Sequence, residues 1–325
     1  MYNIYSKSCY GLNELEDNSI HAVVTDPPYG INLEDWDQLP DPKIWENCFR
    51  VLKPGAFLFC FSAIKFQHVF TTNLLNAGFE FKDVLLWTYL NGRVPPIDVD
   101  KKIDNFLGIE REVIGQYNYS QGSPNSNKKD SYKSTSAKTK ASEQSENWVG
   151  FGTGLKTAYE PIIVVQKPLE GTLAQNIMKY QTGALNIDAT RIAYEHGETK
   201  VGHNPHPLGR VMSNIIQTES FGDYEKYFNI NHQNNNFEQD YENTYFFGKV
   251  RDGKKTGNIH PTKKPVALME CLNKLATIEN QIILDPFMGS GSTGVAALNL
   301  HRNFIGYEQN EDYFKIAQDR LLNKI

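Results

Sequence analysis

Apolar runs alternate with stretches of helical spacing in the first part of the chain. Residues 22–25 form a short apolar run and residues 56–61 a longer one, and both are typical of buried strands. Between them, Asp41-Pro42 supplies an N-cap followed by a first-turn proline, and an apolar stripe runs from Trp45 to Leu52. This alternation predicts an α/β protein with a mostly parallel sheet covered by helices.

The same alternation continues to the end of the sequence. Further strands are expected at residues 79–87, 159–166, 281–284 and 303–307. Further helices are expected at residues 66–77, 262–277, 295–300 and 311–324, and Thr262 can cap the second of them.

Two polar tracts interrupt this pattern. Residues 120–145 are rich in Ser, Asn, Lys and Gln and poor in large apolar side chains, so we expect a flexible loop there. Its lysines make it either a solvated linker or an arm that touches phosphate. A second tract, residues 229–243, is rich in Asn and Gln.

Composition excludes several classes of protein. The four cysteines are far apart, which argues against a zinc cluster and a disulfide scaffold, so we expect no metal and reduced thiols in a cytoplasmic protein. No apolar run approaches the roughly 20 residues that span a membrane, and we see no secretory signal. The net charge of −5 does not suggest a nucleic-acid binder, but a local basic cleft can coexist with an acidic remainder.

A glycine-rich turn follows the strand expected at residues 281–284. Gly289, Gly291 and Gly294 fit the spacing G-x-G-x-x-G, and the turn opens a helix whose free N–H groups favour an anion. Asp285 precedes the turn, and Glu308 ends the next strand, where an acid can hold ribose hydroxyls. These features are typical of a nicotinamide dinucleotide site and of an adenosylmethionine site alike.

A stiff turn, Asp26-Pro27-Pro28-Tyr29, follows the first strand and should lie at the same sheet edge. Asp26 and the carbonyl of Pro27 can each accept one N–H of an amino group. Tyr29 can stack on a flipped base, a contact worth about 1–3 kcal/mol. The turn therefore suits direct methyl transfer to an exocyclic amino group, provided that the two turns meet in space.

With these motifs, the chain resembles the amino-methyltransferases of DNA with the β order of motifs, in which the catalytic motif precedes the cofactor motif. The resemblance is carried by Thr25–Gly30, by His260-Pro261-Thr262-Lys263-Lys264-Pro265 and by residues 284–293. Residues 158–161 and 182–188 also resemble phage and prophage DNA methylases. The family has a Rossmann-like, S-adenosylmethionine-dependent methyltransferase fold, mostly parallel with one antiparallel strand, and an inserted recognition region.

The resemblance assigns roles to individual residues. It implies that Asp26, Pro27, Pro28 and Tyr29 are catalytic. It implies an S-adenosyl-L-methionine site formed by Asp285, Pro286, Phe287, Gly289, Ser290, Gly291, Thr293, Glu308, His260, Thr262 and Lys263. One departure is Lys7-Ser8-Cys9, where many members have an acidic residue near the first strand.

The resemblance also predicts a domain organisation. The expected parts are residues 1–116, the catalytic half; 117–147, a flexible polar loop; 148–190, a return to the catalytic domain; 191–256, the target-recognition region; and 257–325, the cofactor-binding half. Trp148 and Phe151 fit either a wall of the base pocket or ordinary core packing.

We expect site-specific methylation of adenine N6 in double-stranded DNA by base flipping. Cytosine N4 is the alternative, although Asp rather than Ser at position 26 favours adenine. A NAD-dependent oxidoreductase would leave Asp26–Tyr29 unexplained, and a catalytically silent DNA-binding subunit is a third class. The sequence leaves open a cognate restriction endonuclease and a homodimer, and we expect no membrane partner.

Overall fold

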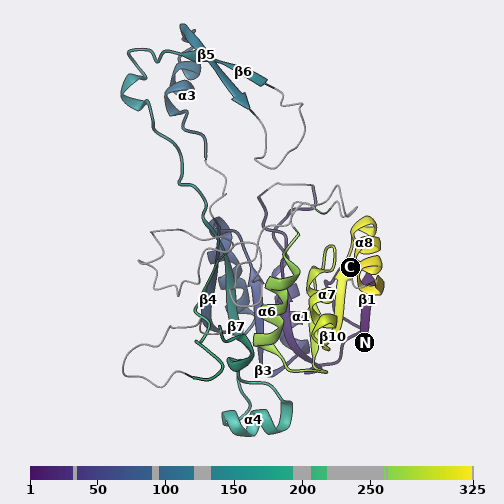
Figure 1. Ribbon diagram of the computed structural model, residues 1–325. Coiled ribbons are helices and arrows are strands. Elements are labelled where there is room, and N and C mark those ends of the chain that lie inside the picture. The colour runs from purple at the N-terminus through teal and green to yellow at the C-terminus, as the bar shows by residue number, and fades with distance from the viewer. Residues whose placement is uncertain are drawn as a thin grey trace. The chain divides into compact units, whose positions relative to one another are not determined.

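The computed structural model describes residues 1–31, 35–89, 95–120, 133–192, 206–217, 260 and 263–323. The chain divides into two compact units (Figure 1). We call Met1–Leu90 with Tyr159–Ile325 the sheet unit, and Asn91–Ala158 the hairpin unit. Each is described by itself.

Eight strands form the sheet unit's central sheet, in the order β1-β10-β9-β2-β3-β7-β4-β8. β7 is antiparallel to both of its neighbours, β3 and β4, and the other adjacent strands are parallel. The expected fold, mostly parallel with one antiparallel strand, is confirmed. The strands are β1 (Tyr2–Ser6), β2 (Ile20–Thr25), β3 (Leu52–Phe61), β4 (Glu80–Thr88), β7 (Tyr159–Gln166), β8 (Ile215–Gln217), β9 (Ile282–Asp285) and β10 (Asn303–Glu308).

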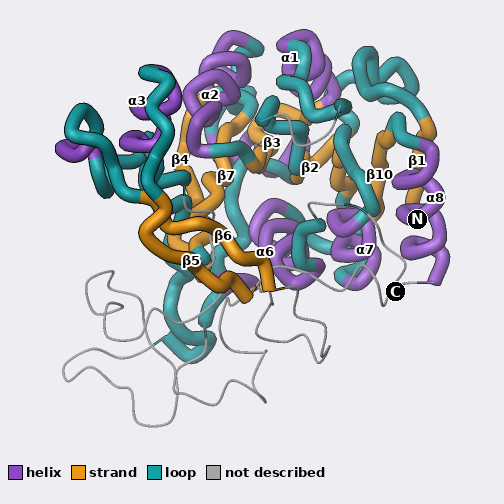
Figure 2. Tube along the Cα trace, turned by 90° about the horizontal axis from the view of Figure 1, so that it is seen from above, coloured by secondary structure: helices purple, strands orange, loops and turns teal. Residues whose placement is uncertain are grey.

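Helices cover both faces of this sheet (Figure 2). α1 (Pro42–Val51) and α2 (Gln67–Asn76) lie on one face, and α6 (Val266–Ala276), α7 (Ser292–Asn299) and α8 (Glu311–Asn323) pack on the other. The short helix α4 (Leu173–Tyr180) follows β7, and the 3₁₀ turns η1 (Ile64–Phe66) and η3 (Asp188–Thr190) lie in connections. A layered α/β architecture results, because both faces of the apolar strands must be buried.

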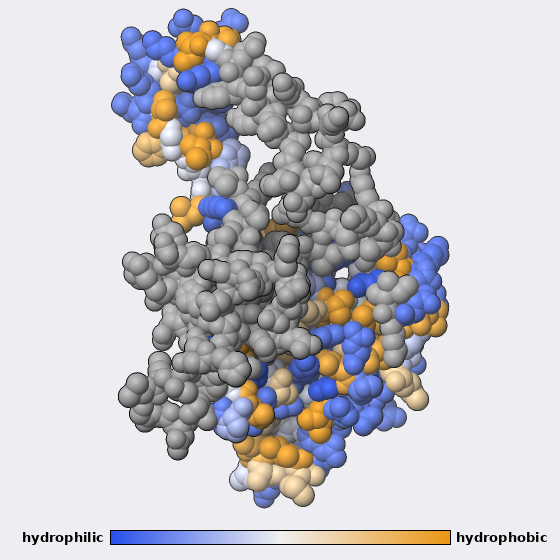
Figure 3. All heavy atoms as spheres, viewed as in Figure 1, coloured by the Kyte–Doolittle hydropathy of each residue, from blue (hydrophilic) through white to orange (hydrophobic). Residues whose placement is uncertain are grey.

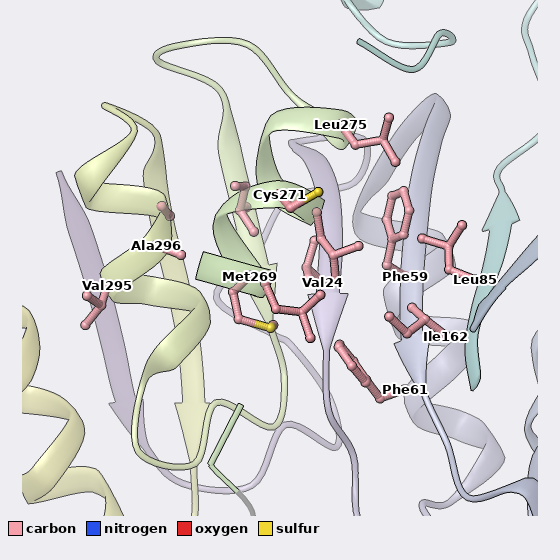
Figure 4. Packing of buried hydrophobic residues seen from close by; sticks show 14 of the residues in the cluster. Val24, Phe59, Phe61, Leu85, Ile162, Met269, Cys271, Leu275, Val295 and Ala296 are labelled. Atoms are coloured by element: carbon pink, nitrogen blue, oxygen red, sulfur yellow. The ribbon is translucent and has the colours of Figure 1, made fainter. Parts of the chain in front are cut away.

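Alternating strand residues supply the two hydrophobic cores. Val23 and Leu58 pack with α1 and α2, whereas their neighbours Val24 and Phe59 pack with α6 and α7. Figure 4 shows Val24 and Phe59 in the second core, beside Met269 of α6. On the face of the sheet unit coloured in Figure 3, apolar and hydrophilic residues are interspersed in small groups. The side chains of the long apolar runs are buried on both faces of the sheet, because successive strand side chains point to opposite faces and helices cover each face.

A local sequence signal sets the start of α1 but not that of α6. α1 begins where predicted, because the Asp41 side chain accepts a 2.8 Å hydrogen bond from the Lys43 N–H and Pro42 occupies the first turn. The predicted cap at Thr262 is wrong: α6 begins at Val266, with Pro265 at the N-cap position and no side-chain cap. Thr262 itself lies outside the described residues.

The hairpin unit contains helix α3 (Val99–Phe106), strands β5 (Val113–Ser120) and β6 (Lys133–Thr139), and the 3₁₀ turn η2 (Glu146–Trp148). β5 and β6 form an antiparallel ladder. Residues 133–139 are thus a strand where the polar composition predicted a loop, because backbone hydrogen bonds hold a ladder without large apolar side chains. The unit extends beyond the predicted 117–147 segment at both ends.

A buried ion cluster lies among the described residues of the hairpin unit. The Arg111 guanidinium lies 2.8 Å from Asp100 and 3.4 Å from Asp104, and all three side chains are almost fully buried. Trp148 and Phe151 contact each other edge to face at 5.1 Å between ring centroids, yet each is about half exposed, so neither is an ordinary core residue.

Among the residues that the structure describes, no helix is long and apolar enough to cross a membrane. In the same part of the chain, no three or more His, Cys, Asp or Glu side chains form a group that could hold a metal ion. The four cysteines are buried free thiols.

Candidate active site

The two turns singled out in the sequence meet at one edge of the sheet. β2 and β9 are neighbouring parallel strands, so their carboxyl ends lie side by side. The Thr25 hydroxyl, at the end of β2, donates a 2.7 Å hydrogen bond to Asp285 Oδ1, at the end of β9. Both turns line one cavity of about 450 Å³, within the usual size range of small-molecule sites.

Most residues predicted for the site border this cavity. They are Asp26, Pro27, Pro28, Tyr29, His260, Lys263, Asp285, Pro286, Phe287, Gly289, Ser290, Thr293 and Glu308. Gly291 does not line the cavity but belongs to the glycine-rich turn, and Thr262 lies outside the described residues.

The Asp26 carboxylate is hydrogen-bonded at both oxygens. The Tyr29 hydroxyl donates to Oδ1 at 2.6 Å, and the Lys264 ammonium donates to Oδ2 at 2.5 Å. Glu160 lies 3.4 Å from both the Tyr29 hydroxyl and the Lys264 ammonium. The site is therefore a compact network of two carboxylates, one phenol and one ammonium.

Burial shapes the protonation of this network. Removal from water raises the pKa of Asp26, and the Lys264 ammonium and the Tyr29 hydroxyl offset part of that effect. Burial by itself lowers the pKa of Lys264, but the carboxylates of Asp26 and Glu160 outweigh it, so the pKa of Lys264 is raised. Burial next to Asp26 also raises the pKa of Tyr29. Lys264 is therefore an ammonium and Tyr29 a neutral phenol.

Asp37 fixes the backbone of the catalytic turn. Its Oδ1 accepts the N–H groups of Tyr29 at 2.8 Å and Gly30 at 3.0 Å, and its Oδ2 accepts that of Ile31 at 3.1 Å. The residue is only 4% exposed. Pro27 and Pro28 have no N–H groups. The Asp37 carboxylate therefore binds the first three N–H groups that follow the two prolines.

Asp285 points into the glycine-rich turn. Beyond its bond to Thr25, it accepts the Thr293 hydroxyl at 2.6 Å and the Phe287 N–H at 3.1 Å. Burial raises its pKa to about 7, against the effect of these donors. Asp285 thus ties together the end of β9, the start of α7 and the catalytic strand β2.

Two glycines give this turn its shape. Gly291 has φ +82°, and a Cβ there would lie 3.1 Å from the Ala317 Cβ on α8. Gly289 has φ +50°, and a Cβ there would lie 2.8 Å from His260 Nε2. Only glycine combines this backbone with so close an approach.

Glu308 receives backbone donors from two segments. The Gly289 N–H donates to Oε2 at 3.0 Å and the Asn310 N–H to Oε1 at 2.7 Å. Each oxygen keeps a lone pair, so the carboxylate can also accept two ribose hydroxyls. Burial raises the pKa of Glu308.

An aromatic wall surrounds His260. Its ring centroid lies 4.4 Å from that of Tyr313 and 6.1 Å from that of Trp36. Burial, together with Lys264, Lys263 and Arg320, lowers the pKa of His260 to about 4. His260 is therefore a neutral ring, and it lies beside Gly289 of the glycine-rich turn.

Four residues of the site were missed by sequence reasoning. Lys264 and Glu160 stand inside segments already quoted for the resemblance, so the signal for them was present. Asp37 and Tyr313 stand in no motif, and only the folded chain brings them to the cavity. Lys7, Ser8 and Cys9 also line the cavity, at the position where many relatives carry an acid.

The lining fits S-adenosylmethionine. The Glu308 carboxylate can accept two hydroxyl groups, and Phe287 and Ile44 supply apolar surface. The catalytic turn forms another part of the same wall, so a bound sulfonium can face the Asp26 side. Fold, cavity and paired turns together define an S-adenosylmethionine-dependent methyltransferase.

Comparisons with known proteins specify the class. Residues 20–319 match the DNA methylase family model of N6 and N4 methyltransferases. The chain is 29% identical to the Type II methyltransferase M.HindIII of Haemophilus influenzae over 99% of this chain and 94% of that protein. It is 25% identical to the Type II methyltransferase M1.MboII of Moraxella bovis over 97% of this chain and 94% of that protein.

A solved structure is similar in fold. The PvuII DNA methyltransferase, which is cytosine-N4-specific, aligns over 100% of this chain and 93% of its own, with a TM-score of 0.51 and 14% identity. The chain belongs to the N6/N4 family of DNA methylases, whose methyl donor is S-adenosylmethionine. It is an enzyme that methylates DNA.

Proposed function

We propose that this enzyme transfers the methyl group of S-adenosylmethionine to N6 of adenine in double-stranded DNA. One observation carries the proposal: the Thr25–Asp285 hydrogen bond joins the Asp26 turn to the glycine-rich turn at one cavity. A base placed against Tyr29 then has a methyl donor within the same cavity.

The target amino group is held by the catalytic turn. Its two N–H bonds are directed to the Asp26 carboxylate and the Pro27 carbonyl, and the base stacks on the Tyr29 ring. As the nitrogen forms its bond to the methyl carbon, the carbon–sulfur bond breaks and its electron pair stays on sulfur. The nitrogen gains positive charge, which the Asp26 carboxylate stabilises inside a buried site, and it then loses one of its protons to solvent. A base inside a duplex cannot reach this turn, so the nucleotide is extruded first.

The cofactor-binding residues orient the methyl donor. When bound, S-adenosylmethionine supplies an electrophilic methyl group. We assign the ribose hydroxyls to Glu308 and the methionine end to the turn from Phe287 to Gly289, close to His260 and Lys263. Apolar and aromatic lining at Phe287 and Tyr313 keeps water from competing for the methyl group.

Adenine is favoured over cytosine by the residue at position 26. The catalytic turn begins with aspartate rather than serine, and Asp26 lines the cavity. Cytosine N4 remains the alternative, because it presents the same kind of amino group and a fold relative is cytosine-N4-specific.

We assign recognition of the DNA sequence to residues 191–256. Of these, the structure describes residues 191–192 and 206–217, which include the Ile192–Arg210 bridge and strand β8 at the sheet edge. A cognate restriction endonuclease is a partner suggested by the Type II methyltransferases to which the chain is similar.

The decisive experiment identifies the product. DNA from a methylation-deficient strain is incubated with enzyme and S-adenosylmethionine, digested to nucleosides and analysed by mass spectrometry. We expect N6-methyl-2′-deoxyadenosine; finding N4-methyl-2′-deoxycytidine alone would favour the cytosine-N4 alternative.

An inactive variant provides the control. Asp26→Ala should remove methylation while S-adenosylmethionine still raises the melting temperature, because Asp26 binds the amino group rather than the cofactor. NAD should give no such protection. Full activity of Asp26→Ala would contradict the mechanism.

A further inference from the structure

Glu160 is a second carboxylate beside the catalytic one. It stands near the start of β7, and in the antiparallel ladder with β4 it is paired with Trp87. Its side chain is 17% exposed, about the same as that of Asp26. The antiparallel strand β7 thus places Glu160 near Asp26, at the end of β2, although the two residues are more than a hundred positions apart in the sequence.

Lys264 lies between the two carboxylates. Its ammonium is 2.5 Å from Asp26 Oδ2 and 3.4 Å from Glu160 Oε2, and its side chain is 6% exposed. The rings of Phe61 and Tyr29 lie on its other sides, with centroids 5.0 Å and 5.6 Å from the ammonium. The ammonium can therefore change carboxylate partners by small rotations, without entering water.

The contact to Asp26 conflicts with methyl transfer. In the proposed reaction Asp26 stabilises positive charge on the target nitrogen, but an ammonium at 2.5 Å neutralises that carboxylate and repels the same charge. Tyr29 already uses the other oxygen. The carboxylate acts at full strength only when Lys264 moves away, and a buried ammonium moves only to another anion.

We propose that Glu160 is a positioning residue that accepts the Lys264 ammonium from Asp26 when the target amino group binds. This inference rests on the proposed function, since it concerns the same amino group. No covalent bond forms or breaks in the exchange: one ion pair lengthens and another shortens. Before DNA binds, the Lys264 contact keeps Asp26 ionised and in place.

A kinetic comparison tests the exchange. Glu160→Gln removes the second anion but keeps the shape of the side chain, so Lys264 stays on Asp26. We expect the single-turnover rate to fall at least tenfold, with an unchanged KM for S-adenosylmethionine because Glu160 is not among the described residues that line the cavity. Glu160→Asp, which keeps the charge, should recover part of the rate.

A double-mutant cycle separates this role from a structural one. Lys264→Met removes the ammonium, so adding Glu160→Gln to it should cause little further loss if Glu160 acts through Lys264. An equal fold-loss from Glu160→Gln in both backgrounds would overturn the proposal. So would a fully active Glu160→Gln enzyme.

The controls use the same DNA and labelled S-adenosylmethionine. Glu170→Gln breaks an exposed glutamate–lysine pair, Glu170–Lys179, and should leave the rate unchanged. Protection from thermal unfolding by S-adenosylmethionine reports that each variant is folded. Finding N4-methylcytosine as the wild-type product would refute the adenine assignment alone, because the cycle measures transfer to either amino group.

Discussion

Asp37 illustrates how one residue outside any motif controls the catalytic turn. Its carboxylate accepts three consecutive backbone N–H groups, from Tyr29 to Ile31, in a buried position. The two prolines before these donors have no N–H groups, so the Asp37 carboxylate holds the first three backbone donors of the segment. Pre-organisation of Tyr29 therefore depends on a residue eight positions further along.

Asp37→Asn should weaken both folding and catalysis. An amide keeps one acceptor oxygen but turns an NH₂ group toward a backbone N–H, so we expect a loss of about 1–3 kcal/mol in unfolding free energy. The methylation rate should fall with it because Tyr29 loses its fixed position. Urea unfolding and single-turnover methylation measure the two effects.

The control is Glu46→Gln, which removes an exposed carboxylate paired with Lys43. It should leave both quantities unchanged. Wild-type stability and rate in Asp37→Asn would show that the three hydrogen bonds are not needed.

Asp285 makes stability depend on pH. Burial raises its pKa to about 7 in the folded chain, above the ordinary value of 3.8, so the folded state holds this proton more tightly. The contribution of this group to stability therefore declines as pH rises from about 4 to 7 and is constant above that. Asp285→Asn, which does not ionise, lacks this decline.

The free energy of unfolding of Asp285→Asn relative to wild type should accordingly increase between pH 5 and pH 8. Comparing the two proteins at each pH cancels the titration of other groups, including His260. Denaturant unfolding at four pH values measures the difference. A difference independent of pH would mean that the carboxyl of Asp285 titrates normally.

At the scale of elements, the start of α7 is positioned by close packing against α8. Gly291 precedes α7 with φ +82°, and its Cα faces Ala317. The turn can lie this close to α8 because neither residue has a large side chain. The same turn brings the Gly289 N–H to Glu308, so the packing of α7 on α8 also positions the carboxylate proposed to hold the ribose.

Gly291→Ala should destabilise the sheet unit by about 1–3 kcal/mol, because the added Cβ meets Ala317 and the backbone conformation disfavours alanine. It should also weaken S-adenosylmethionine binding. Thermal unfolding with and without S-adenosylmethionine measures both.

Gly150→Ala is the matched control. Gly150 has a similar φ of +85°, and no described residue lies within 4 Å of the Cβ that the substitution adds. It should cost only about 1 kcal/mol and leave cofactor binding intact. Equal losses in the two variants would assign the effect to backbone conformation rather than to the α7–α8 contact.

At the scale of the whole molecule, the hairpin unit is an insertion into a hairpin of the main sheet. The chain leaves after β4 and returns at β7, where Thr88 and Tyr159 are paired across the antiparallel ladder. All eight strands of the main sheet lie outside Asn91–Ala158. The main sheet is therefore complete without the hairpin unit.

Replacing residues 91–158 by a short Gly/Asn turn should give a folded protein that S-adenosylmethionine still stabilises against heat, because paired antiparallel strands need only a few residues to connect them. The midpoint shift with S-adenosylmethionine should equal that of the full chain. An unfolded product, or loss of the shift, would show that the hairpin unit supports the main fold.

The elements were largely predictable, and their partners were not. Apolar runs located β2, β3, β7, β9 and β10 within a few residues, because burial on both faces leaves a continuous apolar pattern. β6 was missed, since a polar ladder has no such pattern. β1 was also missed; it is a half-exposed strand that owes its place to pairing with β10.

The sequence by itself determined the α/β class, the two turns and the order in which they occur, because these depend on local spacing, backbone restriction by proline and freedom at glycine. Tertiary structure alone decided that Asp37 holds the catalytic turn, that Lys264 and Glu160 share Asp26, and that Thr25 meets Asp285. Those contacts join distant positions or positions outside any motif, and a hydrogen bond a few ångströms long exists only once the path of the whole chain has placed both ends.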